Sequence, residues 1–369
     1  MKVLVHGFSW LRGGVESYLL SYCGELLRNH PDLTFEFVIY GETPDFARPL
    51  IESGCVFHEV IPRTVKPVAN YRDLVDLVDE GAYDLLWFNV NTLSDITLYR
   101  IAKKHRVKTL VHSHNSKLMG NRVNAFLHHL HQPFVEKTAD FVTACSGDAA
   151  RFLFSEPLVD SARCRVLPNA IDCDAFRFCP EERTVIRNEL GLDDQFVVGH
   201  TGRFATQKNH EFLLDVFKEI CILHSNSKLL LLGSGSEEHQ IRKKISLLDL
   251  QDSVLLLGSV EDAFRYYSAM DCFVFPSLFE GLGLSLLEAQ ANGLHCVASD
   301  RVPDEAFVKE NCLKMSLEES PADWARACLN KDRDVSKRMS AADCLRGRGY
   351  DISTSSEELF KLFIRTVSS

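Results

Sequence analysis

Two glutamates eight residues apart in the C-terminal half of the chain have the spacing and setting of a ligand site. They lie in the stretch 275–289, FPSLFEGLGLSLLEA, where an apolar run predicts a strand ending at Pro276 and a glycine-containing loop leads into a helix. Backbone N–H groups at a helix start attract an anion. Because like charges repel, Glu280 should face a ligand's hydroxyl groups, while Glu288, about two turns on, can reach a second hydroxyl group such as a ribose diol. The alternative is an ordinary glycine turn in which Glu280 caps the helix and Glu288 is solvated.

Two cations lie five residues apart in the loop 202–210, GRFATQKNH, directly after a predicted strand over 196–201. The guanidinium of Arg203 can bind phosphate oxygens with two N–H groups, and Lys208 supplies a point charge on a flexible stem. The pair would neutralise a diphosphate leaving group. Taken alone, both residues could equally be surface cations.

Glycine pairs follow two other predicted strands. Gly13-Gly14 comes after the strand 2–6, and Gly233-Ser234-Gly235 comes after the strand 228–232. Glycine lets the backbone approach a ligand closely, although plain turns use it as often. The pattern G-x-G-x-x-G is absent at both places, which disfavours a dinucleotide-binding fingerprint.

A histidine-containing string, VHSHN at 111–115, ends the predicted strand 109–112. His112 and His114 could ligate zinc, but no carboxylate or cysteine follows at a short ligand spacing. The string is therefore interpreted as a contact with substrate or as a structural polar turn. His128, His129 and His131 lie in an apolar helical stretch and are interpreted as structural.

Other catalytic motifs are missing or poorly placed. The strings Asp172-Cys173-Asp174 and Asp332-Arg333-Asp334 could hold a divalent metal on a diphosphate, but neither follows a core strand, so no metal site is expected. Neither G-x-x-x-x-G-K-[ST] nor G-x-S-x-G occurs, which disfavours a P-loop nucleotidase and an α/β-hydrolase.

Short apolar runs alternate with segments of helical period along the whole chain, which predicts parallel sheets covered by helices. The alternation of apolar runs and helical segments is interrupted at 166–172, VLPNAID, and a second α/β series follows. Residues 1–168 and 169–350 are therefore expected to form two doubly wound domains that face a cleft, and residues 351–369 a helix that packs back on the first domain. The predicted strands are 2–6, 35–40, 85–89, 109–112 and 141–145, then 196–201, 228–232, 254–257, 272–276 and 295–298. The predicted helices include 263–269 and 284–291, and the charged stretch from the boundary to residue 194 is interpreted as a polar connection.

Composition places the chain among ordinary globular proteins. It has 369 residues, a formal charge of −10 and 46% hydrophobic residues, so it is not disordered, and its acidity argues against broad nucleic-acid binding. No apolar run reaches the roughly 20 residues that span a bilayer, and the first residues do not resemble a signal peptide. Its 12 cysteines contain no C-x-x-C pair and suggest buried thiols in a reducing compartment. A cytoplasmic location is expected.

Together these residues resemble the family 4 glycosyltransferases, which are retaining enzymes of the GT-B fold. The resemblance covers nearly the whole chain: Gly13-Gly14-Val15-Glu16, the strand end at His112, the boundary 167–172, Arg203 with Gln207-Lys208-Asn209, and Glu280 to Glu288. The last is similar to the family's Glu-x(seven)-Glu motif. The strings 112–115 and 145–150 look like the bacterial capsule and exopolysaccharide branch. Ala170 departs from the family, which usually has glycine there.

The resemblance implies roles for these residues. Arg203 and Lys208 would hold the donor diphosphate, Glu280 the sugar hydroxyls, Glu288 the ribose, and His112 the donor sugar from the opposite domain, with His114 as the alternative. Further donor contacts are expected from backbone groups of Gly13, Gly14, Gly233, Gly281, Leu282, Gly283 and Leu284.

The expected activity is transfer of a sugar, favoured as a UDP-sugar, to a saccharide or lipid-linked oligosaccharide acceptor of surface polysaccharide synthesis. No metal, cofactor or nucleic acid is expected, and membrane contact should be peripheral at most. Rival hypotheses are a non-catalytic sugar-nucleotide-binding subunit and a nicotinamide-dependent oxidoreductase. A glycosidase would need two carboxylates flanking one bond.

Overall fold

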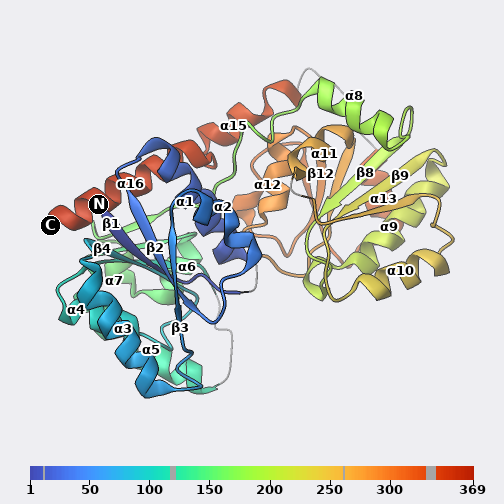
Figure 1. The fold of residues 1–369 in the computed structure, drawn as a ribbon. Coiled ribbons are helices and arrows are strands. Elements are labelled where there is room, and N and C mark those ends of the chain that lie inside the picture. The colour runs from blue at the N-terminus through green and yellow to red at the C-terminus, as the bar shows by residue number, and fades with distance from the viewer. Residues whose placement is uncertain (11–12, 117–121, 261, 330–337) are drawn as a thin grey trace. The chain divides into compact units, whose positions relative to one another are not determined.

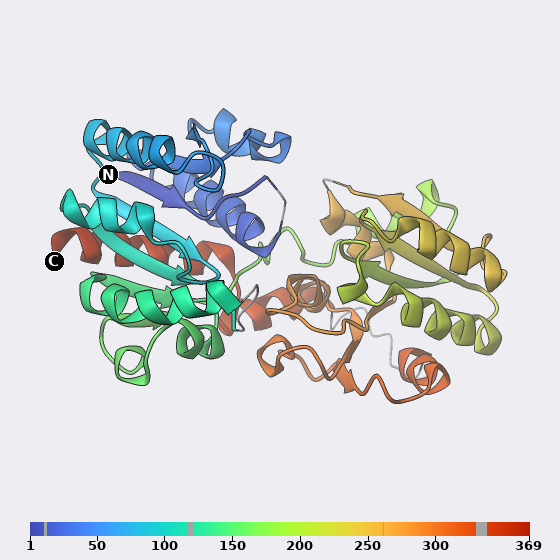
Figure 2. The ribbon, with the colours of Figure 1, turned by 90° about the horizontal axis from the view of Figure 1, so that it is seen from below.

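The computed structural model describes residues 1–10, 13–116, 122–260, 262–329 and 338–369. The chain forms two compact units (Figures 1 and 2). Unit 1 comprises Met1–Ala170 and Ile352–Ser369, and unit 2 comprises Ile171–Asp351. The divisions predicted from the sequence come after residues 168 and 350.

Unit 1 is built on a parallel sheet of seven strands in the order β3-β2-β1-β4-β5-β6-β7. The strand order reverses between β1 and β4, which is the doubly wound arrangement whose ligands bind at the strands' carboxyl ends at this switch point. The strands are β1 (Lys2–His6), β2 (Thr34–Tyr40), β3 (Val56–Val60), β4 (Leu85–Val90), β5 (Lys108–Ser113), β6 (Phe141–Ala144) and β7 (Cys164–Val166).

Helices cover both faces of this sheet. Val3 and Val5 point to one face and pack with residues of α1, α2 and α16, whereas Leu4 points to the other face and packs with residues of α3, α4 and α5. The helices are α1 (Gly14–Asn29), α2 (Arg48–Glu52), α3 (Pro67–Gly81), α4 (Thr97–Lys104), α5 (Arg122–Thr138), α6 (Gly147–Leu153), α7 (Glu156–Val159) and α16 (Ile352–Ser368).

The last helix, α16, belongs to unit 1 although it follows unit 2 in the sequence. Its buried residues include Leu359 and Phe363, and the Phe363 ring centroid lies 5.2 Å from that of Trp87 and 6.4 Å from that of Phe35. Figure 1 shows α16 alongside α1. The C-terminal helix therefore closes the core of the first part of the chain.

Unit 2 repeats the same plan with six parallel strands in the order β10-β9-β8-β11-β12-β13. Its switch point lies between β8 and β11. The strands are β8 (Phe196–Thr201), β9 (Ser227–Leu232), β10 (Val254–Gly258), β11 (Cys272–Phe275), β12 (His295–Ser299) and β13 (Cys312–Met315). The helices are α8 (Pro180–Glu189), α9 (His210–Leu223), α10 (Glu238–Leu247), α11 (Ala263–Ala269), α12 (Leu284–Ala291), α13 (Pro321–Leu329) and α15 (Ala341–Gly347).

Two parallel-sheet, Rossmann-like units confirm the predicted α/β class. The predicted strand 196–201 and helices 263–269 and 284–291 have the bounds that β8, α11 and α12 have in the structure. The stretch before residue 194, interpreted as a polar connection, contains α8, and the edge strands β3 and β13 were missed.

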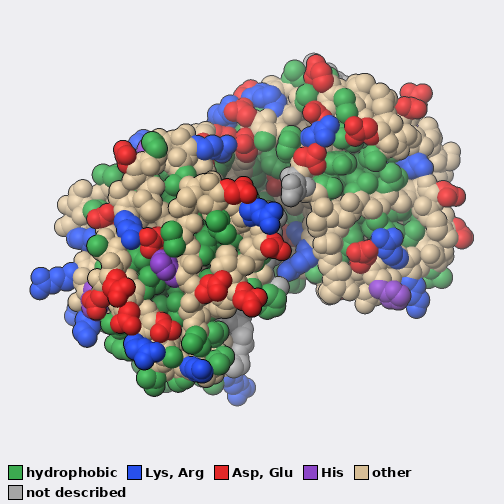
Figure 3. Space-filling view, in the orientation of Figure 1, with side chains coloured by type: hydrophobic (Ala, Val, Ile, Leu, Met, Phe, Trp, Pro, Cys, Tyr) green, Lys and Arg blue, Asp and Glu red, His purple; other side chains and the backbone are tan. Residues whose placement is uncertain are grey.

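Acidic and basic side chains are interspersed on the surface in Figure 3. In the described part of the chain, no helix is both long and apolar enough to cross a membrane.

Candidate active site

At the switch point of unit 2, a lysine and a glutamate from different loops form an ion pair. Lys208 lies in the loop after β8, Glu280 lies in the loop after β11, and β8 and β11 are neighbours in the sheet. The Nζ atom of Lys208 lies 2.7 Å from Oε1 of Glu280, and the two side chains are only 14% and 7% exposed. Two of the predicted catalytic residues are thus brought together although 72 positions separate them.

Hydrogen bonds between these two loops fix the geometry of the pair. The side-chain amide of Gln207 donates to Oε2 of Glu280 at 3.2 Å and to the carbonyl of Phe279 at 3.0 Å. The backbone N–H of Leu278 donates to the carbonyl of Gln207 at 2.8 Å, and the Asn209 side chain donates to the carbonyl of Pro276 at 3.2 Å. The carboxylate of Glu280 is therefore held from both of its oxygens.

The cations of this loop retain capacity for an anionic ligand. The ammonium of Lys208 lies 4.6 Å from the ring centroid of Phe275 and donates one of its three N–H groups to Glu280, so further donors remain. The side chain of Arg203 is exposed, and it makes no hydrogen bond or ion pair with the residues that the structure describes. A diphosphate could take both cations without breaking the Lys208–Glu280 contact.

The start of α12 presents backbone donors. Gly283 precedes the helix with φ +87°, which favours glycine, and a Cβ atom there would lie in tight contact, 3.1 Å from Cε1 of Phe275. The amides of Gly281, Leu282, Gly283 and Leu284 donate to no described residue. The side chain of Leu282 is buried in the core, so only its backbone can contact a ligand.

Glu288, about one turn into α12, is partly buried and paired with a tyrosine. The hydroxyl of Tyr267, from α11, donates to Oε2 of Glu288 at 2.6 Å. Burial raises the pKa of the Glu288 carboxyl above its usual value, whereas Tyr267 and the charge of Lys208 oppose that rise. The alternative of a fully solvated Glu288 does not fit this environment, because its carboxylate is oriented toward one specific donor.

Gly233 has a structural role in this unit. Its φ is +138°, and a Cβ atom there would lie 2.0 Å from the carbonyl oxygen of Gly202. Its N–H donates to the carbonyl of Gly258 at 2.7 Å. Because its amide is occupied, Gly233 serves to let the loop after β9 pack against the loop that carries Arg203.

Two buried histidines flank the loop that carries Lys208: His200 lies on β8, before the loop, and His210 begins α9, after it. His200 Nδ1 bonds to the carbonyl of Val274 at 2.8 Å, and the two imidazole centroids lie 4.9 Å apart. Burial holds the pKa of His200 well below its usual value and lowers that of His210 to about 4. Both rings are therefore neutral near pH 7, and they add no charge to the site.

The switch point of unit 1 also gathers polar side chains, but they are neutral. His114 follows β5, and its Nε2 lies 3.0 Å from Oδ1 of Asn89 at the end of β4. The amide of Asn89 donates to the carbonyl of Trp87 at 3.3 Å, so Oδ1 is an acceptor and Nε2 of His114 carries the proton. Burial lowers the pKa of His114 to about 3.

His112 lies deeper than His114 and leaves one ring nitrogen unpaired. Its Nδ1 bonds to Oγ1 of Thr143 at 2.8 Å, and its ring stacks on Tyr18 with centroids 4.8 Å apart. Burial holds the pKa of His112 well below its usual value. Nε2 of His112 and the hydroxyl of Tyr18 are both buried and have no hydrogen-bond partner among the described residues. Unpaired buried polar atoms are unfavourable, so a water or a ligand group is expected to pair with them.

The two glycines at the start of α1 differ in what their amides do. The N–H of Gly13 donates to Oε2 of Glu16 at 2.8 Å, and the hydroxyl of Ser9 donates to Oε1 of the same carboxylate at 2.7 Å. The amide of Gly14 has no described partner. Of the predicted backbone contacts in this turn, Gly14 is thus the one with a free donor.

The metal alternatives gain no support from the described residues, among which no group of three potential ligands gathers. Asp172 accepts hydrogen bonds from the amides of Asp174 and Ala175, and Asp174 pairs with Arg346 at 2.7 Å. The string Asp332-Arg333-Asp334 lies outside the described residues. His128 accepts from the amide of Leu93, as expected for a structural histidine.

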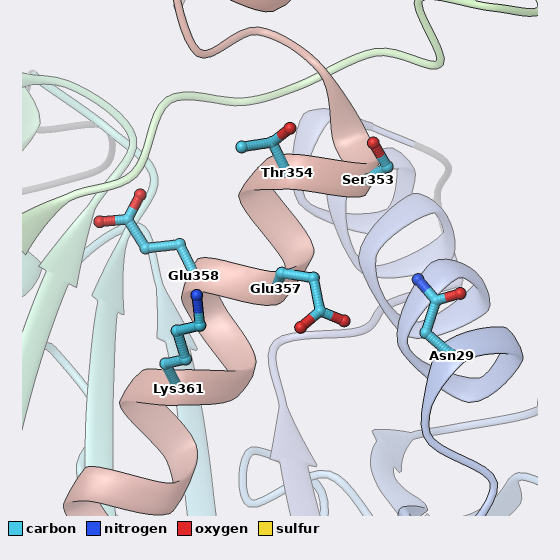
Figure 4. A pocket seen from close by; sticks show the side chains of 6 residues that line it. All are labelled: Asn29, Ser353, Thr354, Glu357, Glu358 and Lys361. Atoms are coloured by element: carbon cyan, nitrogen blue, oxygen red, sulfur yellow. The ribbon is translucent and has the colours of Figure 1, made fainter.

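An open depression of about 670 Å³ lies elsewhere in unit 1 (Figure 4). Its lining side chains come from α16 and from Asn29 at the C-terminal end of α1, whereas the glycine turn lies at the N-terminal end of α1. A helix of 16 residues is about 24 Å long, so the depression is separate from the histidine cluster. It is lined by Asn29, Ser353, Thr354, Glu357, Glu358 and Lys361.

Three residues of these groups were not singled out from the sequence: Tyr18, Asn89 and Tyr267. Asn89 ends a strand that neighbours β1, so the strand order of a doubly wound sheet could have identified it. Tyr18 and Tyr267 lie on helices among other buried aromatic residues. Nothing in their local sequence separates them from the core.

Comparison with known proteins identifies related chains. The family model Glycosyltransferase Family 4 matches residues 12–175, and the model Glycosyl transferases group 1 matches residues 182–323. EpsF of Bacillus subtilis (strain 168), named as a glycosyltransferase, is 30% identical over 363 residues, which cover 95% of this chain and 93% of EpsF. A UDP-Gal:α-D-GlcNAc-diphosphoundecaprenol α-1,3-galactosyltransferase of Escherichia coli is 27% identical over 278 residues, 66% of this chain and 71% of that protein.

Solved structures share the fold. The crystal structure of Anabaena HepE in complex with UDP superposes with a TM-score of 0.81 at 19% identity and covers 99% of this chain and all of HepE. The lipopolysaccharide glycosyltransferase WaaG gives 0.68 at 14% identity, with 98% and 99% of the two chains covered. With both family models and a relative that matches along almost its full length, this chain belongs to the family 4 glycosyltransferases and has the GT-B fold.

Proposed function

We propose that this chain moves a sugar, with retention of its anomeric configuration, from a nucleotide-diphosphate donor to a saccharide acceptor. The observation that carries the proposal is the Lys208–Glu280 pair at the switch point of unit 2. It places a cation for phosphate next to a carboxylate for sugar hydroxyls, and the exposed Arg203 on the same loop adds a second cation.

In this proposal each group of unit 2 takes one part of the donor. Arg203, Lys208 and the amides at the start of α12 bind the diphosphate and stabilise the charge that develops on it as the glycosidic bond breaks. Glu280 accepts hydrogen bonds from the sugar and Glu288 from the ribose. From unit 1, Nε2 of His112 or the ring of His114 bonds to a hydroxyl of the donor sugar.

The proposed chemistry is attack of the acceptor hydroxyl on the same face of the sugar that the diphosphate leaves. The acceptor oxygen forms the new bond to the anomeric carbon, the bond to the diphosphate oxygen breaks, and the acceptor's proton passes to the departing diphosphate. Because Arg203 and Lys208 supply positive charge, transfer should continue in excess chelator. Complete loss that only a divalent ion restores would contradict this part.

We propose a UDP-sugar as donor and a lipid-linked intermediate of surface polysaccharide synthesis as acceptor, reached from the cytoplasmic side of a membrane. The E. coli relative is named for UDP-Gal and a diphosphoundecaprenol-linked acceptor, and HepE was crystallised with UDP. These names support the choice of substrates for a first trial.

The test is a panel of UDP- and GDP-sugars, followed by acceptor trials with the donor that binds. Transfer, with an NMR coupling constant that gives the same anomer in product and donor, is the expected result. Donor binding without transfer to any acceptor would identify a sugar-nucleotide-binding subunit, and binding of NADH in place of sugar nucleotides would identify an oxidoreductase.

A further inference from the structure

One side of α5, in unit 1, exposes a row of large apolar side chains. Val123, Phe126, Leu130 and Phe134 are 62%, 65%, 59% and 37% exposed. Their spacing of three, four and four residues puts them on one face of the helix. We call this row the α5 face. Scattered apolar residues are normal on a protein surface, but a continuous row of four marks a contact surface.

The exposed charges of α5 itself are of one sign. The other exposed residues of the helix are Arg122, His129, Pro133 and Lys137, so its exposed side carries no acid over the described range 122–138. Glu136 is the helix's one acidic residue, and its two oxygens accept hydrogen bonds from the amide and the hydroxyl of Ser155 at 2.6 and 2.8 Å. This occurs in a chain whose formal charge is −10.

Neighbouring elements extend the same pattern. The exposed guanidinium of Arg100, on α4, lies 5.2 Å from the ring centroid of Phe134 at the end of the row. Asp140, just beyond the helix, pairs with Lys103 at 2.8 Å and with Lys108 at 3.6 Å. The nearby acid is thus already neutralised, while Arg100 remains to meet an anion.

We propose that the α5 face docks on an anionic lipid bilayer. The four apolar side chains would enter the boundary between headgroups and acyl chains, and Arg122, Lys137 and Arg100 would contact anionic headgroups. A second copy of this chain is the weaker candidate, because a two-fold contact would set the cations of one α5 face against those of the other. The inference deepens the proposed function, since a lipid-linked acceptor lies in such a bilayer.

Sedimentation with vesicles tests the docking surface. Phosphatidylcholine vesicles with and without a quarter of phosphatidylglycerol are mixed with the full chain, without donor or acceptor. The chain should bind the anionic vesicles, and high salt should weaken binding. The double variant Phe126→Glu/Leu130→Glu should lower the partition coefficient about tenfold or more, because it removes two inserted apolar groups and adds repulsion.

Control variants separate the surface from a general effect of acidic substitution. Ile222→Glu/Leu247→Glu alters two side chains of unit 2 that are 65% and 78% exposed, and it should bind vesicles like the unchanged chain. Arg122→Gln/Lys137→Gln retains the apolar row and should lose several-fold in binding to anionic vesicles only. All variants should keep the melting temperature of the unchanged chain.

The proposal is overturned if the unchanged chain ignores anionic vesicles, if it binds zwitterionic vesicles equally well, or if the α5 and control variants lose binding alike. It is also overturned if light scattering shows a dimer that the α5 variant converts to a monomer. Vesicle binding by a chain that transfers no sugar would refute the proposed function alone. Transfer in detergent without vesicle binding would refute the docking surface alone.

Discussion

The two units place their polar groups at the same topological point but furnish it with opposite chemistry. In unit 2 the switch point holds an ion pair, an exposed guanidinium and a carboxylate on α12. In unit 1 the ends of β4 and β5 hold two imidazoles that burial keeps neutral and an amide, beside a tyrosine hydroxyl that has no partner among the described residues.

The difference shows that the doubly wound sheet sets the position of a site and the loops set its ligand. Opposed full charges suit a group such as a diphosphate bonded to sugars, whereas neutral donors and acceptors suit hydroxyl groups. Variants in the two units should therefore differ in size and in kind of effect.

The largest effect is expected from the charged pair in unit 2. Lys208→Ala or Glu280→Ala should each lower kcat about 100- to 1,000-fold, because each removes a charge that acts on the reacting centre. The double variant should lose little more than the worse single variant, since the two side chains act as one unit. Steady-state kinetics with the best donor measures all three.

Lys243→Ala, on the exposed side of α10, is the matched control and should behave like the unchanged enzyme. A Lys208→Ala enzyme within about threefold of normal turnover, with an unchanged melting temperature, would show that the pair is structural and would remove the contrast between the units.

A smaller effect is expected from the histidines of unit 1. Loss of a neutral hydrogen bond is worth about 1 kcal/mol, so His112→Ala or His114→Ala should lower kcat/KM roughly five- to tenfold. The larger loss identifies the ring that meets the sugar. Because burial lowers the pKa of His114 to about 3 and holds that of His112 well below its usual value, neither ring should contribute a pH-dependent step near pH 6.5.

A pH-rate profile of each histidine variant checks this assignment. A step near pH 6.5 that disappears in His112→Ala would mean that the ring titrates freely. In that event the neutral character of the unit 1 cluster would be wrong.

The smallest effect is expected at Tyr267, which we regard as a positioning residue for Glu288. Tyr267→Phe should raise the donor KM several-fold with little change in kcat, because one hydrogen bond to a ligand-binding carboxylate is lost. It should weaken UDP binding but leave binding of 2′,3′-dideoxy-UDP unchanged. A merely structural defect would weaken both nucleotides alike.

The same variant should shift the pH dependence of donor affinity. Glu288 is proposed to accept hydrogen bonds from the ribose hydroxyls, so binding of the donor favours its ionised form. The affinity for the donor should therefore fall as the pH drops through the raised pKa of this carboxyl. Tyr267 holds that pKa down, so its hydroxyl's removal should move the fall to higher pH, and Glu288→Gln should abolish it. Calorimetry with an intact UDP-sugar measures both.

The strand ends could be predicted because buried parallel strands are nearly continuous apolar runs. The strand 196–201 and the helix 284–291 were predicted with the bounds of β8 and α12, and with them the loops that carry Lys208 and Glu280. By contrast, α8 buries little more than Ile186 and the guanidinium of Arg187, so its sequence reads as a polar connection. β3 lies at a sheet edge and is half exposed, which weakens its apolar signal.

The contacts within the site could not be predicted, because they join residues that are far apart in the sequence. The local sequence around one residue gives no sign of its partner. The hydroxyl of Tyr267 meets Glu288 across 21 positions, and Asn89 meets His114 across 25. That the amide of Gly233 is occupied, while that of Gly14 has no partner among the described residues, follows from hydrogen bonds that only three-dimensional packing reveals.

The return of α16 to unit 1 has a consequence for how the chain is made. On the ribosome, the sheet of unit 1 emerges long before the helix that shields Trp87 and Phe35, whereas unit 2 is one unbroken stretch, Ile171–Asp351. The second unit can therefore complete its core first. Until α16 has emerged, the first unit has an uncovered flank, which is the apolar surface around Trp87 and Phe35. That flank is open to contact with other chains.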